Sequence, residues 1–271
     1  MNAPGQCWAL VNIHQLRAEG KISREESRAL VRSAVRLQCS VAPGETVDNI
    51  FMKLTPTNSP LLPDIMDLFP SFTYFFNTRH PVPMLASSKK MNDKILKGNW
   101  YEMLGFGWRF RRAHRFTFPY SAKYDQLLTS LGSWWPNVDD DEFGIIWISG
   151  VIAEYFDNKS RYDDVILYEN LSVNPEQELK KIFKSLSISE NHLGVALQAM
   201  NWDSQKGHYG EVLKCILHSF KIKDRCFQRG LSSSQNLPDN LLVMFDAYMS
   251  KIGAPLTTTM TVEDYKELFR K

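Results

Sequence analysis

The chain has 271 residues, of which 44% are hydrophobic and 23% are charged. This composition is typical of a folded globular protein and excludes a disordered, collagen-like or small disulfide-stabilised chain. Lys and Arg number 32 against 30 Asp and Glu, so the net charge of +2 by itself predicts neither a nucleic-acid partner nor an anionic membrane partner. We expect a single domain over residues 1–271.

The cysteines are spread along the chain, at Cys7, Cys39, Cys215 and Cys226. They lack the short spacings of a zinc site or a redox pair, so no metal site is predicted. No apolar run reaches the ~18 residues that a membrane span needs. The start of the chain also lacks the pattern of a secretory signal. The chain as written is therefore expected to be cytoplasmic.

The first strong helix signal covers residues 23–39. It begins with Ser23 and Glu26, the pair of residue types that cap a helix start reciprocally. The apolar run at residues 49–54 predicts a short strand, and residues 61–69 favour a short helix. All of these predictions rest on local periodicity and on turn signals.

Two strand–helix units follow in the sequence. Residues 72–76 form a β-branched and aromatic run that predicts a strand, and residues 82–96 predict a helix with prolines confined to its first turn. A further strand is predicted at residues 165–168, with a helix that begins at Asn174. Other helices are expected at residues 143–156 and near 190–201, 238–251 and 261–270, whereas 98–137 are interpreted mainly as loop with short helices.

This alternation of strands and helices indicates the doubly wound α/β class. We therefore expect a three-layer α/β architecture, in which helices cover both faces of a central parallel sheet. In such sheets, ligands bind beyond the carboxyl ends of the strands, where the N–H groups of helix starts face an anion.

Two segments are predicted to lie at such strand ends. In FFNTRHPVPMLASSKK, Arg79 leaves the first strand and Ser87 lies eight residues later, about two turns into the next helix. A guanidinium and a hydroxyl at this spacing suit a phosphate, although an arginine here also suits a surface ion pair. The neighbouring His80 is interpreted as a helix-entry residue. Tyr168 and Glu169 end the later strand, either as nucleotide contacts or as a packing pair.

The first of these segments resembles the 3'-phosphate-binding segment of sulfotransferases that use 3'-phosphoadenosine 5'-phosphosulfate. The stretch DVILYENLSVNPEQELKKIFKSLSI is similar to that family's Tyr-Glu-Asp/Asn-Leu strand and Asn-Pro helix. The resemblance covers about residues 47–252. It implies a P-loop-like sulfotransferase fold and the transfer of a sulfuryl group from that nucleotide co-substrate to a hydroxyl or amine acceptor.

The resemblance also implies roles for individual residues. Arg79 and Ser87 would bind the 3'-phosphate, and Tyr168 would lie near the adenine. Lys53 occupies the place of a family lysine near the transferring sulfate. The residues Arg229 and Gly230, in FQRGLSS, are similar to the loop that closes over the same phosphate, without its lysine.

The chain departs from the family pattern in two places. Nothing in residues 1–46 resembles the loop that cradles the 5'-phosphosulfate, so the chain is expected to begin just after that loop and its strand. The position of a histidine base in small-phenol members is Thr55 here, which leaves the base unassigned. Two alternatives stay open: an enzyme that is active in a longer form, with a Golgi location if that form carries an anchor, or a noncatalytic sulfotransferase-fold binding protein.

Two charged segments have simpler interpretations. The most basic one alternates aromatic side chains with Arg109, Arg111, Arg112 and Arg115, a mixture that can bind single-stranded nucleic acid. The near-neutral total charge favours a solvated loop or the wall of an anion site instead, so no nucleic-acid partner is expected. The acidic run at residues 139–142 is interpreted as a helix start rather than a metal site.

Overall fold

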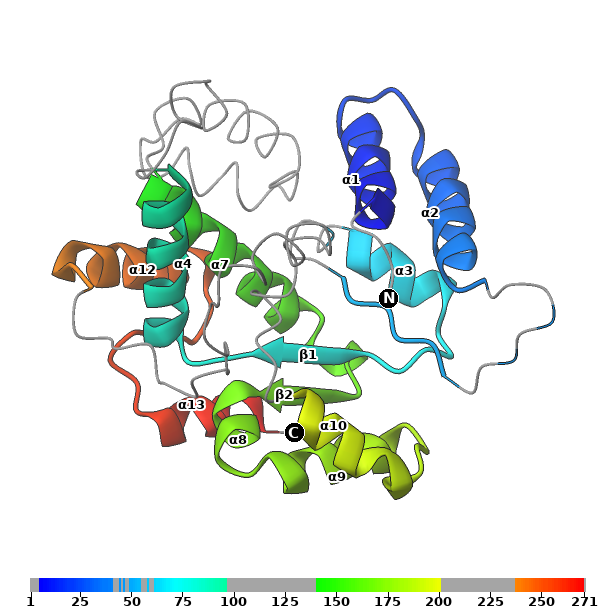
Figure 1. Cartoon of the computed structure of the whole chain (residues 1–271). Helices are drawn as coiled ribbons and strands as arrows, with labels where there is room; N and C mark the ends of the chain where they lie inside the picture. Colours follow the sequence, from blue (N-terminus) through cyan, green and yellow to red (C-terminus); the bar gives the residue numbers. More distant parts are fainter. Residues whose placement is uncertain are drawn as a thin grey trace, which may run out of the picture.

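The structure is a computed structural model, and it describes residues 5–40, 49–54, 61–96, 140–200 and 237–270, with Gly44, Thr46 and Asn58. Within these ranges the chain is mixed α/β and mostly helical, with one parallel pair of strands (Figure 1). The predicted α/β class with parallel strands is confirmed. The larger central sheet of the expected three-layer architecture is not found among the described residues.

Three helices form the N-terminal part of the described chain. Helices α1 (Gly5–Ala18) and α2 (Arg24–Gln38) lie side by side, and α3 (Leu62–Leu68) packs against α2 (Figure 1). The predicted capping of α2 is confirmed, because the Ser23 hydroxyl accepts from the Glu26 N–H and the Glu26 carboxylate accepts from the Ser23 N–H.

A small apolar core, the N-terminal cluster, joins these helices. Its buried members are Leu10, Ile13, Val31, Val35, Leu61 and Ile65. The polar centre beside it is Asp64, whose buried carboxylate lies 2.5 Å from Arg17 and 2.8 Å from Arg28. Because one arginine comes from α1 and the other from α2, this carboxylate links all three helices.

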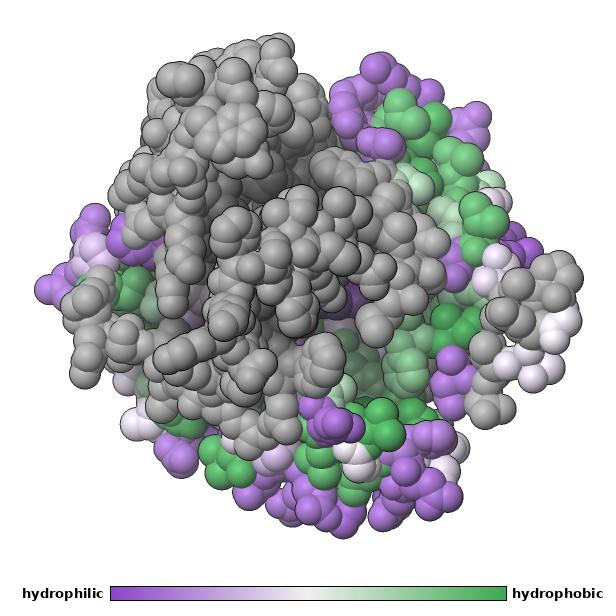
Figure 2. Space-filling model, viewed as in Figure 1, coloured by the Kyte–Doolittle hydropathy of each residue, from purple (hydrophilic) through white to green (hydrophobic). Residues whose placement is uncertain are grey.

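The predicted strand at residues 49–54 is wrong, because this segment has no regular secondary structure. Met52 and Leu54 are half-buried against the cores, whereas Phe51 is 69% exposed. Hydrophobic residues lie at the surface on the right-hand side of the view in Figure 2. A short apolar run can gain burial by packing on helices without pairing in a sheet, and periodicity does not distinguish the two cases.

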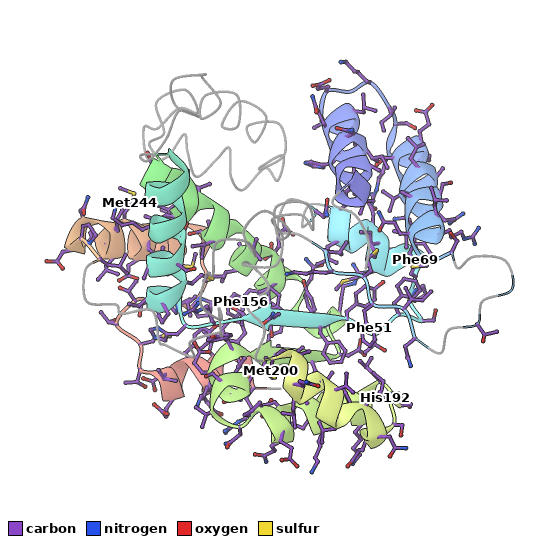
Figure 3. The ribbon with its side chains drawn as sticks, in the orientation of Figure 1. Phe51, Phe69, Phe156, His192, Met200 and Met244 are labelled. Carbon is purple, nitrogen blue, oxygen red and sulfur yellow. The ribbon has the colours of Figure 1, made fainter. Side chains whose placement is uncertain are left out.

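The strand pair consists of β1 (Phe75–Thr78) and β2 (Asp164–Leu167), which run parallel. Two hydrogen bonds mark its start: the Tyr74 N–H donates to the Asp163 carboxylate, and the Asp163 N–H donates to the Tyr74 carbonyl. The sheet therefore begins three residues later in the first segment than predicted. Phe72 stacks instead on Phe69, which follows the last residue of α3 and is labelled in Figure 3.

Most of the remaining helices confirm predicted ones: α4 (Pro81–Leu96), α7 (Asp140–Asp157), α9 (Pro175–Ser185), α10 (Leu193–Ala199), α12 (Asp239–Ile252) and α13 (Val262–Phe269). Helix α8 (Tyr168–Val173) was not predicted; it begins at Tyr168, which was expected to be the last residue of the strand that ends at Leu167. Helix α9 begins after Asn174 as predicted, although the Asn174 side chain makes no capping hydrogen bond. None of the helices in the described ranges has the length and apolar character that crossing a bilayer requires.

The main core lies where β1, α7, α12 and α13 meet. It is built on stacked aromatic rings: Phe76 of β1 lies 4.2 Å from Tyr155 of α7, and Phe269 of α13 lies 5.1 Å from Tyr155, between ring centroids. Burying each such side chain contributes about 2 kcal/mol. These contacts attach the C-terminal helix to the strand that leads into the candidate site.

Candidate functional site

Two predicted site residues, Arg79 and Tyr168, meet at the carboxyl ends of the strand pair. The register pairs Thr78 with Leu167, so the next residue of each strand lies at the same edge of the sheet. The guanidinium carbon of Arg79 lies 4.8 Å from the centroid of the Tyr168 ring. This is the distance of a cation–π contact, and it holds a half-buried arginine at the strand end.

A buried carboxylate ties the same two strand ends together. Glu169 is the second residue of α8, and its Oε1 accepts a hydrogen bond from the His80 N–H at 2.8 Å. Both side chains are buried. The sequence predicted Glu169 only as a nucleotide contact or a packing partner, and the bond to His80 was missed. The signal for it was an acidic residue two positions after the last residue of β2.

The interpretation of His80 as a helix-entry residue is confirmed by its hydrogen bonds. Its Nδ1 faces the Val82 N–H at 3.4 Å, and its Nε2 faces the Met260 carbonyl at 3.0 Å. An N–H only donates and a carbonyl only accepts, so in this arrangement Nδ1 is the acceptor and Nε2 the donor. Because both ring nitrogens have partners, His80 is poorly placed to serve as a general base.

The first turn of α4 offers no N–H group to an anion, which corrects the expectation for this helix start. Pro81 and Pro83 have no N–H, the Val82 N–H donates to His80 Nδ1, and the Met84 N–H donates to the His80 carbonyl. An anion at this edge would therefore depend on side chains, with Arg79 the first candidate.

Helix α13 packs against the end of β1 through Tyr265. The Tyr265 hydroxyl lies 2.9 Å from the Thr78 hydroxyl, in the buried interior, and the Tyr265 ring meets the His80 ring edge to face at 5.5 Å. Burial raises the pKa of Tyr265, so this phenol keeps its proton. Sequence reasoning predicted the helix but gave it no role at the site.

The other predicted site residues that the structure describes, Ser87 and Lys53, are not brought to this edge. Ser87 lies on α4 and is exposed, and no described contact joins it to Arg79. Lys53 is exposed in the irregular segment at residues 49–54 and makes no described contact with Arg79 or Tyr168. The residues Arg229, Gly230 and Thr55 lie outside the described residues, as do the basic segment around Arg109 to Arg115 and the predicted loop at 98–137.

The described site is therefore a small cradle of three side chains, which we call the strand-end cradle: Arg79, Tyr168 and Glu169. It combines one fixed positive charge, one aromatic ring and one buried carboxylate. This combination suits the recognition of an anionic ligand that carries a planar group. Within the described ranges, no three His, Cys, Asp or Glu side chains are grouped as metal ligands would be.

Comparisons of the chain with protein-family models, with curated proteins and with solved structures find no match.

Proposed function

We propose that this chain binds a 3'-phosphorylated adenine nucleotide at the strand-end cradle. We further propose that it is a sulfotransferase-like protein, which transfers a sulfuryl group from 3'-phosphoadenosine 5'-phosphosulfate to a hydroxyl or amine acceptor. The observation that carries the proposal is the contact between Arg79 and Tyr168. These residues come from the two separate segments that resemble the family, and they meet at the strand edge where α/β sheets bind ligands.

In this proposal the β1–β2 pair belongs to the central sheet of a three-layer α/β fold. The Arg79 guanidinium would bind the 3'-phosphate through two parallel N–H bonds. Its contact with Tyr168 restricts the arginine side chain before binding, which lowers the entropy that ordering it costs. The adenine would use the opposite face or the edge of the same tyrosine ring. Ser87, Arg229 and Gly230 are proposed to complete the phosphate site.

The transfer step would be an in-line displacement at sulfur. The acceptor oxygen or nitrogen forms a bond to sulfur, the bond from sulfur to the bridging phosphate oxygen breaks, and the 3',5'-bisphosphate leaves with the electron pair. A base takes the acceptor proton, and a cation stabilises the charge on the departing phosphate. Lys53 is the proposed cation.

Two observations favour a second candidate function, that of a noncatalytic nucleotide-binding protein. Lys53 is exposed in an irregular segment, and both nitrogens of His80 already have partners. The cradle could therefore bind the nucleotide without the groups that move a proton or stabilise a leaving group.

The test is calorimetric titration of the full chain with adenosine 3',5'-bisphosphate. We expect micromolar binding that weakens about 100-fold or more in Arg79→Ala, because two charge-assisted hydrogen bonds are lost. Arg32→Ala is the matched control, since it removes the same charge from an exposed position on α2 and should leave the affinity unchanged. Absence of binding to the unmodified chain, or equal affinity in Arg79→Ala, would overturn the proposal.

Incubation with a sulfate-labelled donor and with phenol, sugar and amine acceptors separates the two candidates. Labelled acceptor would support the transferase. Binding of the bisphosphate with no transfer to any acceptor class would support the noncatalytic protein.

A further inference from the structure

Only one of the two oxygens of the Glu169 carboxylate accepts a hydrogen bond among the described residues. Oε1 accepts the hydrogen bond from the His80 N–H, whereas Oε2 is buried and has no hydrogen-bond partner among the described residues. Buried carboxylate oxygens in proteins are nearly always paired with a donor, because an unpaired one loses its hydration without compensation. The spare oxygen therefore has a strong preference for any donor that can reach it.

The position of this oxygen is tied to the anion-binding side chain. The hydrogen bond from the His80 N–H fixes the Glu169 carboxylate against the residue that directly follows Arg79. Arg79 in turn lies over Tyr168, the residue that precedes Glu169. The Arg79 guanidinium and the buried Glu169 carboxylate therefore lie at the same strand ends.

This pairing of charges selects a particular kind of ligand. An anion with no hydrogen-bond donor would be attracted by Arg79 and repelled by Glu169. A ligand that carries a donor next to its anionic group would satisfy both residues at once. In a nucleotide with a 3'-phosphate, the 2'-hydroxyl on the neighbouring carbon is such a donor.

We propose that Glu169 is a ligand-binding residue, whose Oε2 accepts a hydrogen bond from the hydroxyl adjacent to the phosphate held by Arg79. This inference rests on the proposed function and deepens it: the cradle recognises a ribose 3'-phosphate as a phosphate–hydroxyl pair and discriminates against the 2'-deoxy form. The oxygen is buried, so the proposed hydrogen bond requires the side chains that cover it to move.

The experiment compares adenosine 3',5'-bisphosphate with 2'-deoxyadenosine 3',5'-bisphosphate by calorimetry. The full chain is expected to bind the deoxy compound about tenfold or more weakly, the effect of one charge-assisted hydrogen bond. In Glu169→Gln the amide oxygen keeps the bond from His80, but the amide nitrogen replaces the spare acceptor and the negative charge is gone. The preference should shrink to about threefold or less, and the deoxy compound should bind more tightly than it binds the unmodified chain.

Glu176→Gln is the matched control, because it is the same substitution at an exposed position on α9 and should leave the preference unchanged. Equal affinity of the unmodified chain for both compounds, with binding still lost in Arg79→Ala, would overturn this inference and leave the proposed function standing. An unchanged preference in Glu169→Gln would overturn it as well. If neither compound binds, the proposed function fails and this inference fails with it.

Discussion

At the residue scale, His14 of α1 couples stability to pH. Its side chain is buried beside the N-terminal cluster, and this burial, assisted by the charge of Arg17, lowers its pKa from 6.5 to about 4. The folded chain therefore keeps His14 neutral in a range where the unfolded chain protonates it. More protons are bound in the unfolded state between these two values, so stability falls as pH falls from 6.5 to 4.

We expect His14 to contribute about 3 kcal/mol to the loss of stability between pH 7 and pH 4. Urea unfolding at several pH values measures it, and His14→Gln should show a shallower decline by about that amount. His192 is exposed near α10 (Figure 3), so His192→Gln should keep the slope of the unmodified chain. The same slope in His14→Gln would contradict the prediction.

The site shows which residue-level features sequence alone could predict. Arg79 and Tyr168 were predicted because each lies at or just after the end of an apolar run that indicates a strand. The hydrogen bond from His80 to Glu169 was not predicted, because it joins residues 89 apart and exists only in one register of the strand pair. Residue types and their spacing along the chain do not predict the register in which two distant strands pair.

At the element scale, α13 is attached to β1 by a buried pair of hydroxyls, Thr78 and Tyr265. Tyr265→Phe or Thr78→Val alone should destabilise the chain by about 1–2 kcal/mol, because each leaves the other hydroxyl buried without its partner. The double variant should cost less than the sum, with a coupling of about 1 kcal/mol. Urea unfolding of the four proteins measures this coupling.

The control cycle pairs Tyr265→Phe with Thr257→Val, since Thr257 bonds only its near neighbour Thr259 among the described residues. Those two changes should be additive. Additivity in the first cycle would mean that the Thr78–Tyr265 bond does not hold α13 in place.

Helices were predicted well at this scale because their signals are local. Ser23 and Glu26 mark the start of α2, and Thr261 with Asp264 makes a similar reciprocal cap at the start of α13. A strand forms only when it pairs with another strand, and the local sequence does not predict which segment that is. The run at residues 49–54 therefore looked like a strand and is not one, and β1 begins later than its apolar run.

At the scale of the whole molecule, the described chain has two apolar cores of unequal size. The N-terminal cluster has six buried side chains, and the main core has eighteen among the described residues. Leu54 and Tyr74 contact both of them. Because opening a region costs the burial it loses, we expect α1 and α2 to open with a smaller free energy than α7 and α12.

Amide hydrogen exchange followed by mass spectrometry tests this expectation. Peptides from α1 and α2 should take up deuterium faster than peptides from α7 and α12 under native conditions. Equal protection in both sets would show that the two cores unfold as one unit.

The overall class was predictable and the extent of the sheet was not. Alternating strand and helix signals were enough to indicate parallel pairing, and β1 with β2 confirms it. The number of strands in a sheet depends on which distant segments pair with one another, and no local sequence pattern predicts this pairing.

The separation of the paired strands has a consequence for how the chain folds. Asp163 and Tyr74, at the start of the pair, are 89 residues apart, so the sheet must close a long loop before any of its contacts form. Contacts of this kind form slowly, whereas the α1–α2 pair, which is local, forms early. During synthesis at roughly 5–20 residues per second, β1 would leave the ribosome several seconds before β2. Arg79, Tyr168 and Glu169 therefore come together late, and a chain interrupted before that point has helices but no strand-end cradle.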